Sequence, residues 1–131
     1  MTYDFTVTDL IPAQPKQIYD AWLDSRGHAK MTGDRPAAIT ADSGQRFVLL
    51  KGFVIGKNLT LEPGRRIVQS LRTKEFLESD ADSQIEVLLE PVPGGTKVTI
   101  HHTSVPDRLA SYREAGWQKN YFEPMKRFFG G

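Results

Sequence analysis

The residues best suited to do chemistry in this chain are the adjacent histidines His101 and His102. Neighbours on a strand point to opposite faces, so these two imidazoles could not bind one metal ion together. Alternation with Val98 and Ile100 predicts that His102 faces the interior, where it could orient a ligand or exchange a proton. The sequence favours another interpretation, a buried histidine bonded to a hydroxyl or a backbone carbonyl. Since His28 is the only other histidine, we expect no histidine-rich metal site.

Aromatic and thioether side chains form the second group of candidates. Trp117 and Tyr121 lie one helical turn apart near the C-terminus and offer large apolar surfaces with polar tips. They could line a small-molecule pocket, or they could simply pack a helix against a sheet. Trp22 and Met31, on two expected helices near the N-terminus, allow the same two interpretations. Met31 would also suit a flexible pocket rim.

Charged residues give a weaker signal. Arg72 is expected to point outward from a strand, because an unpaired buried charge is costly. Glu78, Asp80 and Asp82 share one loop but lack the Asp-x-Asp-x-Asp-Gly spacing of a calcium site, so we expect them to be solvated. The sequence has no Gly-x-Ser-x-Gly elbow, phosphate-binding glycine loop or dinucleotide fingerprint. We therefore expect no catalytic residues, metal site or cofactor.

Composition excludes several classes of partner. The chain has 131 residues, no cysteine, and 17 Lys+Arg against 16 Asp+Glu, so it lacks the basic surface that nucleic acids and anionic membranes select. Its apolar runs fall far short of the roughly 20 residues of a membrane helix, and residues 1–9 do not resemble a signal peptide. We expect a cytoplasmic protein without nucleic-acid partner or membrane insertion. The sequence favours no particular oligomeric state.

The period of the apolar residues predicts the elements that position these side chains. Alternation at Tyr3, Phe5 and Val7 predicts a strand, and the spacing after Pro15 predicts a helix over 15–25. A second helical turn is expected over 28–33. A long helix is expected over 107–129, with a kink near Gly116. Between them, turn signals separate six expected antiparallel strands, over residues 38–41, 45–51, 53–61, 66–74, 83–90 and 96–105.

This order predicts a single α+β domain over residues 1–131. It consists of a curved antiparallel sheet of about six to seven strands, two short helices, and one long C-terminal helix over the sheet. A helix and a strongly curved sheet do not close along their whole length, so we expect a cavity between them.

Four stretches resemble the C-terminal domain of the Aha-type family, which are activators of the heat-shock chaperone ATPase. Residues 18–22 resemble the family's first helix, and residues 47–56 resemble its paired-strand glycine motif. Residues 61–68 resemble the turn and strand that follow, and residues 105–129 resemble its closing motif. The resemblance implies the helix-grip fold of the START-like, Bet v-like superfamily (SRPBCC), whose members include binders of lipids, sterols and polyketides.

Three functional hypotheses result. The first is a non-enzymatic binding protein that holds a small hydrophobic ligand in the cavity between sheet and helix. The second, implied by the resemblance, is a co-chaperone-like module that binds and stimulates a heat shock protein 90 type ATPase. The third is an enzyme of cyclase or dehydratase type that uses His102. The expected ligand-binding residues are Trp22, Met31, Phe47, Leu49, Ile55, His102, Trp117 and Tyr121.

Overall fold

A computed structural model of the chain describes residues 1–130, except for the side chain at position 114. Within these residues, seven strands form one antiparallel sheet in the order β1-β7-β6-β5-β4-β3-β2. Strands β2 to β7 therefore form a continuous meander, and the N-terminal strand β1 pairs with β7 at the edge of the sheet. The strands are β1 (Thr2–Ile11), β2 (Ala37–Ala38), β3 (Arg46–Leu49), β4 (Val54–Glu62), β5 (Arg66–Thr73), β6 (Ser83–Val92) and β7 (Gly95–Pro106).

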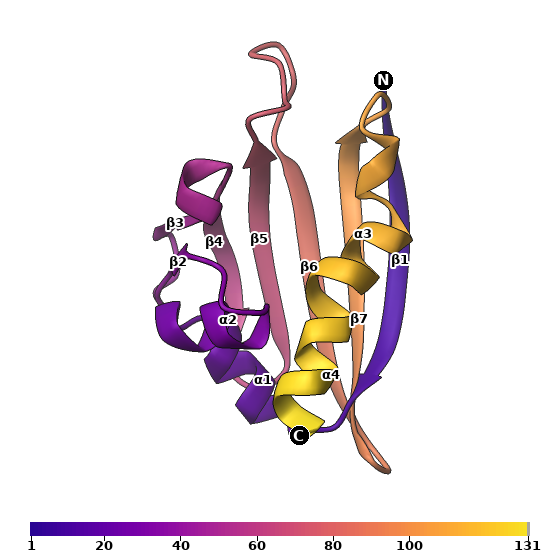
Figure 1. The fold of residues 1–131 in the computed structure, drawn as a ribbon. Helices are drawn as coiled ribbons and strands as arrows, with labels where there is room; N and C mark the ends of the chain where they lie inside the picture. The colour runs from indigo at the N-terminus through magenta and orange to yellow at the C-terminus, as the bar shows by residue number, and fades with distance from the viewer. Residues whose placement is uncertain (131) are drawn as a thin grey trace.

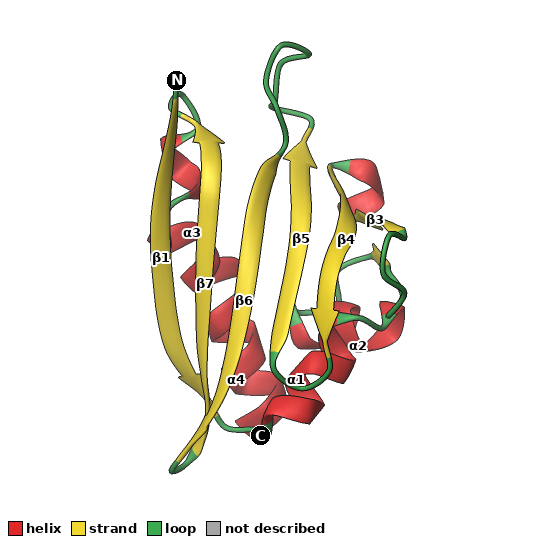
Figure 2. Cartoon of the chain, turned by 180° about the vertical axis from the view of Figure 1, so that it is seen from behind, coloured by secondary structure: helices red, strands yellow, loops and turns green. Residues whose placement is uncertain are grey.

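The helices lie on one face of this sheet, and the other face has no helix over it (Figures 1 and 2). The N-terminal pair is α1 (Pro15–Trp22) and α2 (Ser25–Met31). The C-terminal arm is α3 (Glu114–Trp117), a wider π-helical turn η3 (Gln118–Phe122) and α4 (Glu123–Gly130), and it crosses the sheet diagonally. The predicted α+β architecture is confirmed. No helix described in residues 1–130 has both the length and the apolar character required to cross a membrane.

Local capping explains where the N-terminal helices begin. Pro15 occupies the first helical position, where its missing N–H costs nothing, and the Gln14 N–H donates to Gln17 Oε1 at 2.8 Å. The Asp24 side chain caps α2 by accepting a hydrogen bond from the Gly27 N–H at 2.8 Å. Helix α1 starts at Pro15, as predicted, whereas α2 begins three residues earlier than the turn expected from His28.

Alternation along β7 places its side chains as expected. Val98, Ile100 and His102 are buried against the helices, whereas His101 faces the other side and contacts Thr6 Oγ1 at 2.8 Å. Arg72 also points to the outer face, as predicted, where it forms an ion pair with Asp82 at 2.7 Å.

The prediction that Ile55 faces the interior is wrong. Ile55 is 40% exposed and lies in line with Val48 and Arg72 on the outer face of the sheet. The inner face of β4 carries Val54 and Gly56 instead. Because Gly56 pairs with the buried Phe47 of β3, the register leaves Ile55 no inward position.

The C-terminal segment departs most from the expected single helix over 107–129. Strand β7 continues to Pro106, and a short 3₁₀ turn, η2 (Ala110–Tyr112), precedes α3. The interruption falls at η3, just after the kink expected near Gly116. Pro124 explains its position, because it has no N–H to donate to the carbonyl of Asn120 four residues earlier. The expected strand over 38–41 is also shorter, reduced to the two residues of β2.

Candidate functional site

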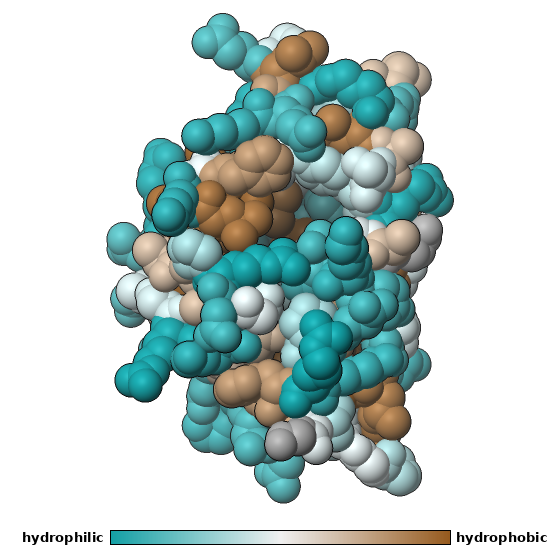
Figure 3. Space-filling view, in the orientation of Figure 1, coloured by the Kyte–Doolittle hydropathy of each residue, from teal (hydrophilic) through white to brown (hydrophobic). Residues whose placement is uncertain are grey.

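A cavity of about 280 Å³ lies between the inner face of the sheet and the C-terminal arm. Figure 3 shows its opening as a hollow with an apolar interior and a mostly hydrophilic border. The volume is just below the range of about 300–1,000 Å³ typical of ligand pockets. The lining residues are His28, Thr32, Arg35, Pro36, Leu49, Leu50, Phe53, Val54, Leu71, Thr73, His102, Ser111, Tyr112, Gly116, Trp117, Asn120 and Tyr121.

The apolar wall of the cavity comes from three neighbouring strands. Leu49 ends β3, Val54 begins β4 and Leu71 lies on β5, and all three point toward the C-terminal arm. Leu50 and Phe53 extend this wall toward solvent, where Phe53 is 36% exposed. A ligand with an apolar body would therefore contact aliphatic side chains on one side and the aromatic side chains of the C-terminal arm on the other.

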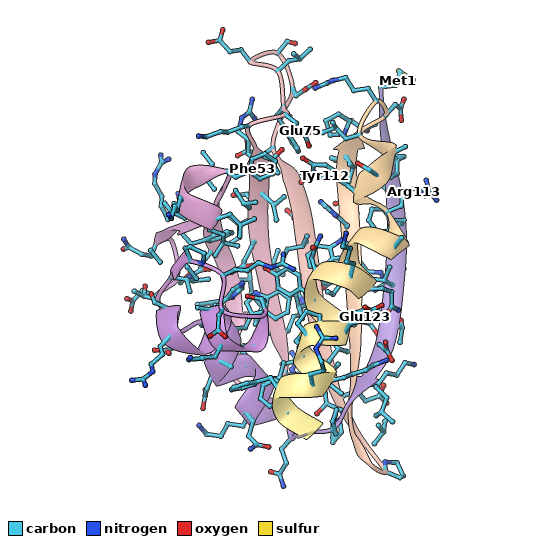
Figure 4. The ribbon with its side chains drawn as sticks, viewed as in Figure 1. Met1, Phe53, Glu75, Tyr112, Arg113 and Glu123 are labelled. Carbon is cyan, nitrogen blue, oxygen red and sulfur yellow. The ribbon has the colours of Figure 1, made fainter. Side chains whose placement is uncertain are left out.

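One side of the opening is built from strained backbone. The short turn η1 (Leu50–Gly52) has φ values of 53° at Leu50, 57° at Lys51 and 97° at Gly52. Glycine adopts the left-handed region freely, but leucine and lysine do so at a cost of about 1–3 kcal/mol each, and such strain is concentrated at functional sites. Figure 4 places Phe53 beside this turn and Tyr112, at the end of η2, across from it.

His28 is held in its neutral form by an aromatic cluster. Its Nδ1–H donates to the Trp22 carbonyl at 2.8 Å. Its Nε2 is therefore unprotonated and accepts a hydrogen bond from the Tyr121 hydroxyl at 2.8 Å. The Tyr121 ring stacks on Trp22 with the ring centroids 5.0 Å apart. Burial lowers the pKa of His28 to about 4, and burial raises the pKa of Tyr121. Neither side chain is charged at neutral pH.

His102 has a matching arrangement on the sheet side. Its Nδ1 accepts from Trp117 Nε1 at 3.2 Å, so its Nε2–H donates to Ser83 Oγ at 3.0 Å. The Ser83 hydroxyl in turn donates a hydrogen bond to the Leu71 carbonyl at 3.0 Å. Burial lowers the pKa of His102 to about 4. This geometry agrees with the favoured interpretation of a histidine bonded to a hydroxyl, and it fixes the Trp117 indole in the cavity wall.

The cavity also has two polar ends. At one end, Thr73 Oγ1 lies 2.5 Å from the Tyr112 hydroxyl, which donates to the Glu75 carboxylate. Burial, reinforced by this carboxylate, raises the pKa of Tyr112 to about 12. At the other end, Arg35 Nη1 donates to Asn120 Oδ1 at 3.0 Å.

The expected ligand-binding residues fall into three groups. Leu49, His102, Trp117 and Tyr121 line the cavity. Trp22, Met31 and Phe47 are buried in the core but are not among the lining residues. Ile55 is on the opposite face of the sheet, as described above. Whether any of them contacts a ligand stays a prediction.

Sequence reasoning missed several lining residues, chiefly His28, Arg35, Tyr112 and Asn120. His28 gave no signal, because its aromatic neighbours Trp22 and Tyr121 lie on other elements and meet it only in the fold. Arg35 and Asn120 gave no signal either, because they are 85 residues apart and meet only in the fold. Among the described side chains, no three of His, Asp or Glu lie close enough together to hold a metal ion.

Comparison with known proteins relates nearly the whole chain to one family. Residues 12–130 match the family described as activator of Hsp90 ATPase homolog 1-like protein. The curated "Activator of 90 kDa heat shock protein ATPase homolog 1" of Homo sapiens is 26% identical over 98% of this chain and 38% of that protein. The Dictyostelium discoideum homologue is 32% identical over 88% of this chain and 30% of that protein. The chain thus spans well under half the length of these relatives.

Solved structures show the same fold. An HSP90 activator from Plasmodium falciparum superposes with a TM-score of 0.87 at 20% identity, covering 98% of this chain and 96% of that one. CalU16 from Micromonospora echinospora superposes with a TM-score of 0.77 at 20% identity, covering 96% of this chain and 75% of that one.

Proposed function

Within the family of activator of Hsp90 ATPase homolog 1-like proteins, to which the chain belongs, we propose that this chain is a non-enzymatic binding protein. It holds a small apolar molecule in the cavity between the sheet and the C-terminal arm. A cytoplasmic location, expected from the sequence, is part of this proposal.

The observation that carries the proposal is the apolar wall of the cavity, formed by Leu49, Val54 and Leu71 and continued toward solvent by Leu50 and Phe53. Apolar surface that faces water inside a cavity is unfavourable, and a ligand that covers it gains about 25 cal/mol per Å². The strained turn η1 supports the same assignment, because the fold maintains a costly backbone conformation at the cavity's opening.

The internal hydrogen bonds of the two histidines favour binding over catalysis. An acid–base catalyst must exchange a proton with the substrate through a free ring nitrogen. Both nitrogens of His28 and both nitrogens of His102 are already engaged within the protein. The cyclase or dehydratase hypothesis would require His102 to release either Trp117 or Ser83 before it could act.

Filling the cavity should weaken the binding of an apolar ligand. In Val54→Trp, an indole replaces an isopropyl group on the apolar wall and occupies space that the ligand needs. We expect the affinity for 1-octanol, used as an apolar probe, to fall by about tenfold or more, equivalent to about 1.4 kcal/mol. Isothermal titration calorimetry measures the change.

The neighbouring substitution Ile55→Trp is the matched control. It adds a tryptophan to the same strand but on the outer face, so 1-octanol should bind as it does to the unsubstituted protein. If Val54→Trp binds 1-octanol as tightly as this control does, the cavity is not the binding site.

The relatives of the chain support a second candidate function. Proteins similar to this chain over 88–98% of its length are described as activators of the 90 kDa heat shock protein ATPase. Under this proposal the chain binds such a chaperone and stimulates its ATP hydrolysis. The two functions are compatible, because cavity and docking surface can occupy different parts of the domain.

The ATPase hypothesis predicts that adding the purified chain to a 90 kDa heat shock protein raises its steady-state rate of ATP hydrolysis in a saturable way. The Val54→Trp and Ile55→Trp variants, assayed side by side, show whether the cavity or the outer face contributes. An unchanged rate, together with no complex in sedimentation velocity, would rule out this second function.

A further inference from the structure

We infer that the ligand of the cavity is a small apolar molecule with a carboxylate, and that the Arg35 guanidinium binds this carboxylate. The inference rests on the proposed binding function and extends it to the chemical class of the ligand.

The charge of the cavity lining is the first step. Arg35 is the only lysine, arginine, aspartate or glutamate among the described residues that line the cavity. The lining histidines are neutral, because both have a pKa lowered to about 4. The lining therefore carries one positive charge and no negative charge at neutral pH, which favours a monoanion over a neutral or dianionic ligand.

The second step is that the protein leaves this charge without a carboxylate partner. Within residues 1–130, no described acidic oxygen lies within ion-pair distance of Arg35, whereas the nearby Lys30 pairs with Asp34 at 2.9 Å. Among the described residues, the Arg35 guanidinium makes one hydrogen bond, from Nη1 to Asn120 Oδ1. An amide oxygen can orient a guanidinium without neutralising it. Asn120 thus positions the guanidinium for an anionic ligand.

The third step is geometric. With Nη1 engaged by Asn120, the Nε and Nη2 edge of Arg35 has no hydrogen-bond acceptor among the described residues. This edge presents two parallel N–H donors, which match the two oxygens of a carboxylate. Leu49, Val54 and Leu71 line the same cavity and would contact the apolar part of the ligand. A volume of about 280 Å³ equals roughly nine water volumes, which fits a short acid.

Octanoate and 1-octanol provide the test, since they share a chain and differ in the anionic group. We expect the unsubstituted protein to bind octanoate about tenfold more tightly than 1-octanol, or better. Arg35→Gln should remove this preference, because it lowers the affinity for octanoate far more than the affinity for 1-octanol. Asn120→Asp should do the same without deleting the arginine, because the nearly isosteric carboxylate neutralises it. Arg46→Gln, on the outer face, should change neither affinity.

Three other results would each overturn a particular claim. Equal affinity for octanoate and 1-octanol in the unsubstituted protein would overturn the carboxylate inference while leaving apolar binding intact. A preference for octanoate that survives in Arg35→Gln would overturn the role of Arg35. Binding of neither compound would overturn the proposed binding function, and the inference with it.

Discussion

Acidification from pH 7.5 to pH 4.5 should lower the free energy of unfolding by about 5 kcal/mol, because two buried histidines stay neutral in the folded chain. Burial lowers the pKa of both His28 and His102 to about 4, against an ordinary value of about 6.5. Between these values the unfolded chain binds protons that the folded chain does not bind. Stability is therefore complete above about pH 6.5 and falls as the pH drops toward 4, by about 2.5 kcal/mol per histidine at pH 4.5.

Urea unfolding followed by tryptophan fluorescence at a series of pH values measures this loss. Replacing one buried histidine, as in His102→Gln, should remove about half of the pH dependence, whatever its effect on stability at pH 7.5. His101→Gln changes a histidine on the outer face, so the loss should persist in that control. A free energy of unfolding that stays constant from pH 7.5 to pH 4.5 would contradict the neutral, buried state of both imidazoles.

Gly56→Ala should cost about 3 kcal/mol or more, which is severe for a single methyl group. A Cβ at this position would lie 2.1 Å from the Ser70 carbonyl oxygen and 2.3 Å from Cζ of Phe47. The first contact is backbone of the adjacent strand β5, so relief requires β4 and β5 to move apart. The second is a ring that is buried in the core, so turning it aside would disturb its packed neighbours.

Thermal and urea unfolding of Gly56→Ala measure this cost. The adjacent Ile55→Val, on the exposed face, should stay within about 0.5 kcal/mol of the unsubstituted protein. Adding Phe47→Leu to Gly56→Ala removes the ring contact and should recover part of the lost stability. A Gly56→Ala protein as stable as the Ile55→Val control would show that β4 and β5 can separate freely, which the packing does not allow.

The sequence predicts which face of the sheet a strand residue points to where polar and apolar residues alternate regularly. Along β7, Val98, Ile100 and His102 separate from Lys97, Thr99 and His101, so the inward position of His102 could be predicted from the sequence and is confirmed. In β4 the apolar pair Val54 and Ile55 gives no phase by itself. Only the pairing of Gly56 with Phe47 decides that Ile55 faces out, and pairing is a property of the folded sheet.

The polar residues that line the cavity could not be predicted from the sequence, for a different reason. Arg35 lies in the connection after α2, and Asn120 lies in a π-helical turn whose position depends on Pro124. The connection has no periodic pattern, and the π-helical turn departs from the regular helix that the apolar period predicts over 107–129. The glycine at position 52 did indicate a turn, but nothing local shows that Leu50 and Lys51 share its left-handed conformation. These are the positions where the fold overrides local preference.

The most direct test of the binding function is a nuclear magnetic resonance titration of methyl-labelled protein with 1-octanol. We predict saturable chemical-shift changes at the methyl groups of Leu49, Val54 and Leu71, which line the cavity. The methyl groups of Val48 and Ile55, on the outer face of the same strands, should not move. Shifts confined to Val48 and Ile55, or no shifts at all up to the solubility limit of 1-octanol, would contradict a ligand-binding cavity between sheet and helix.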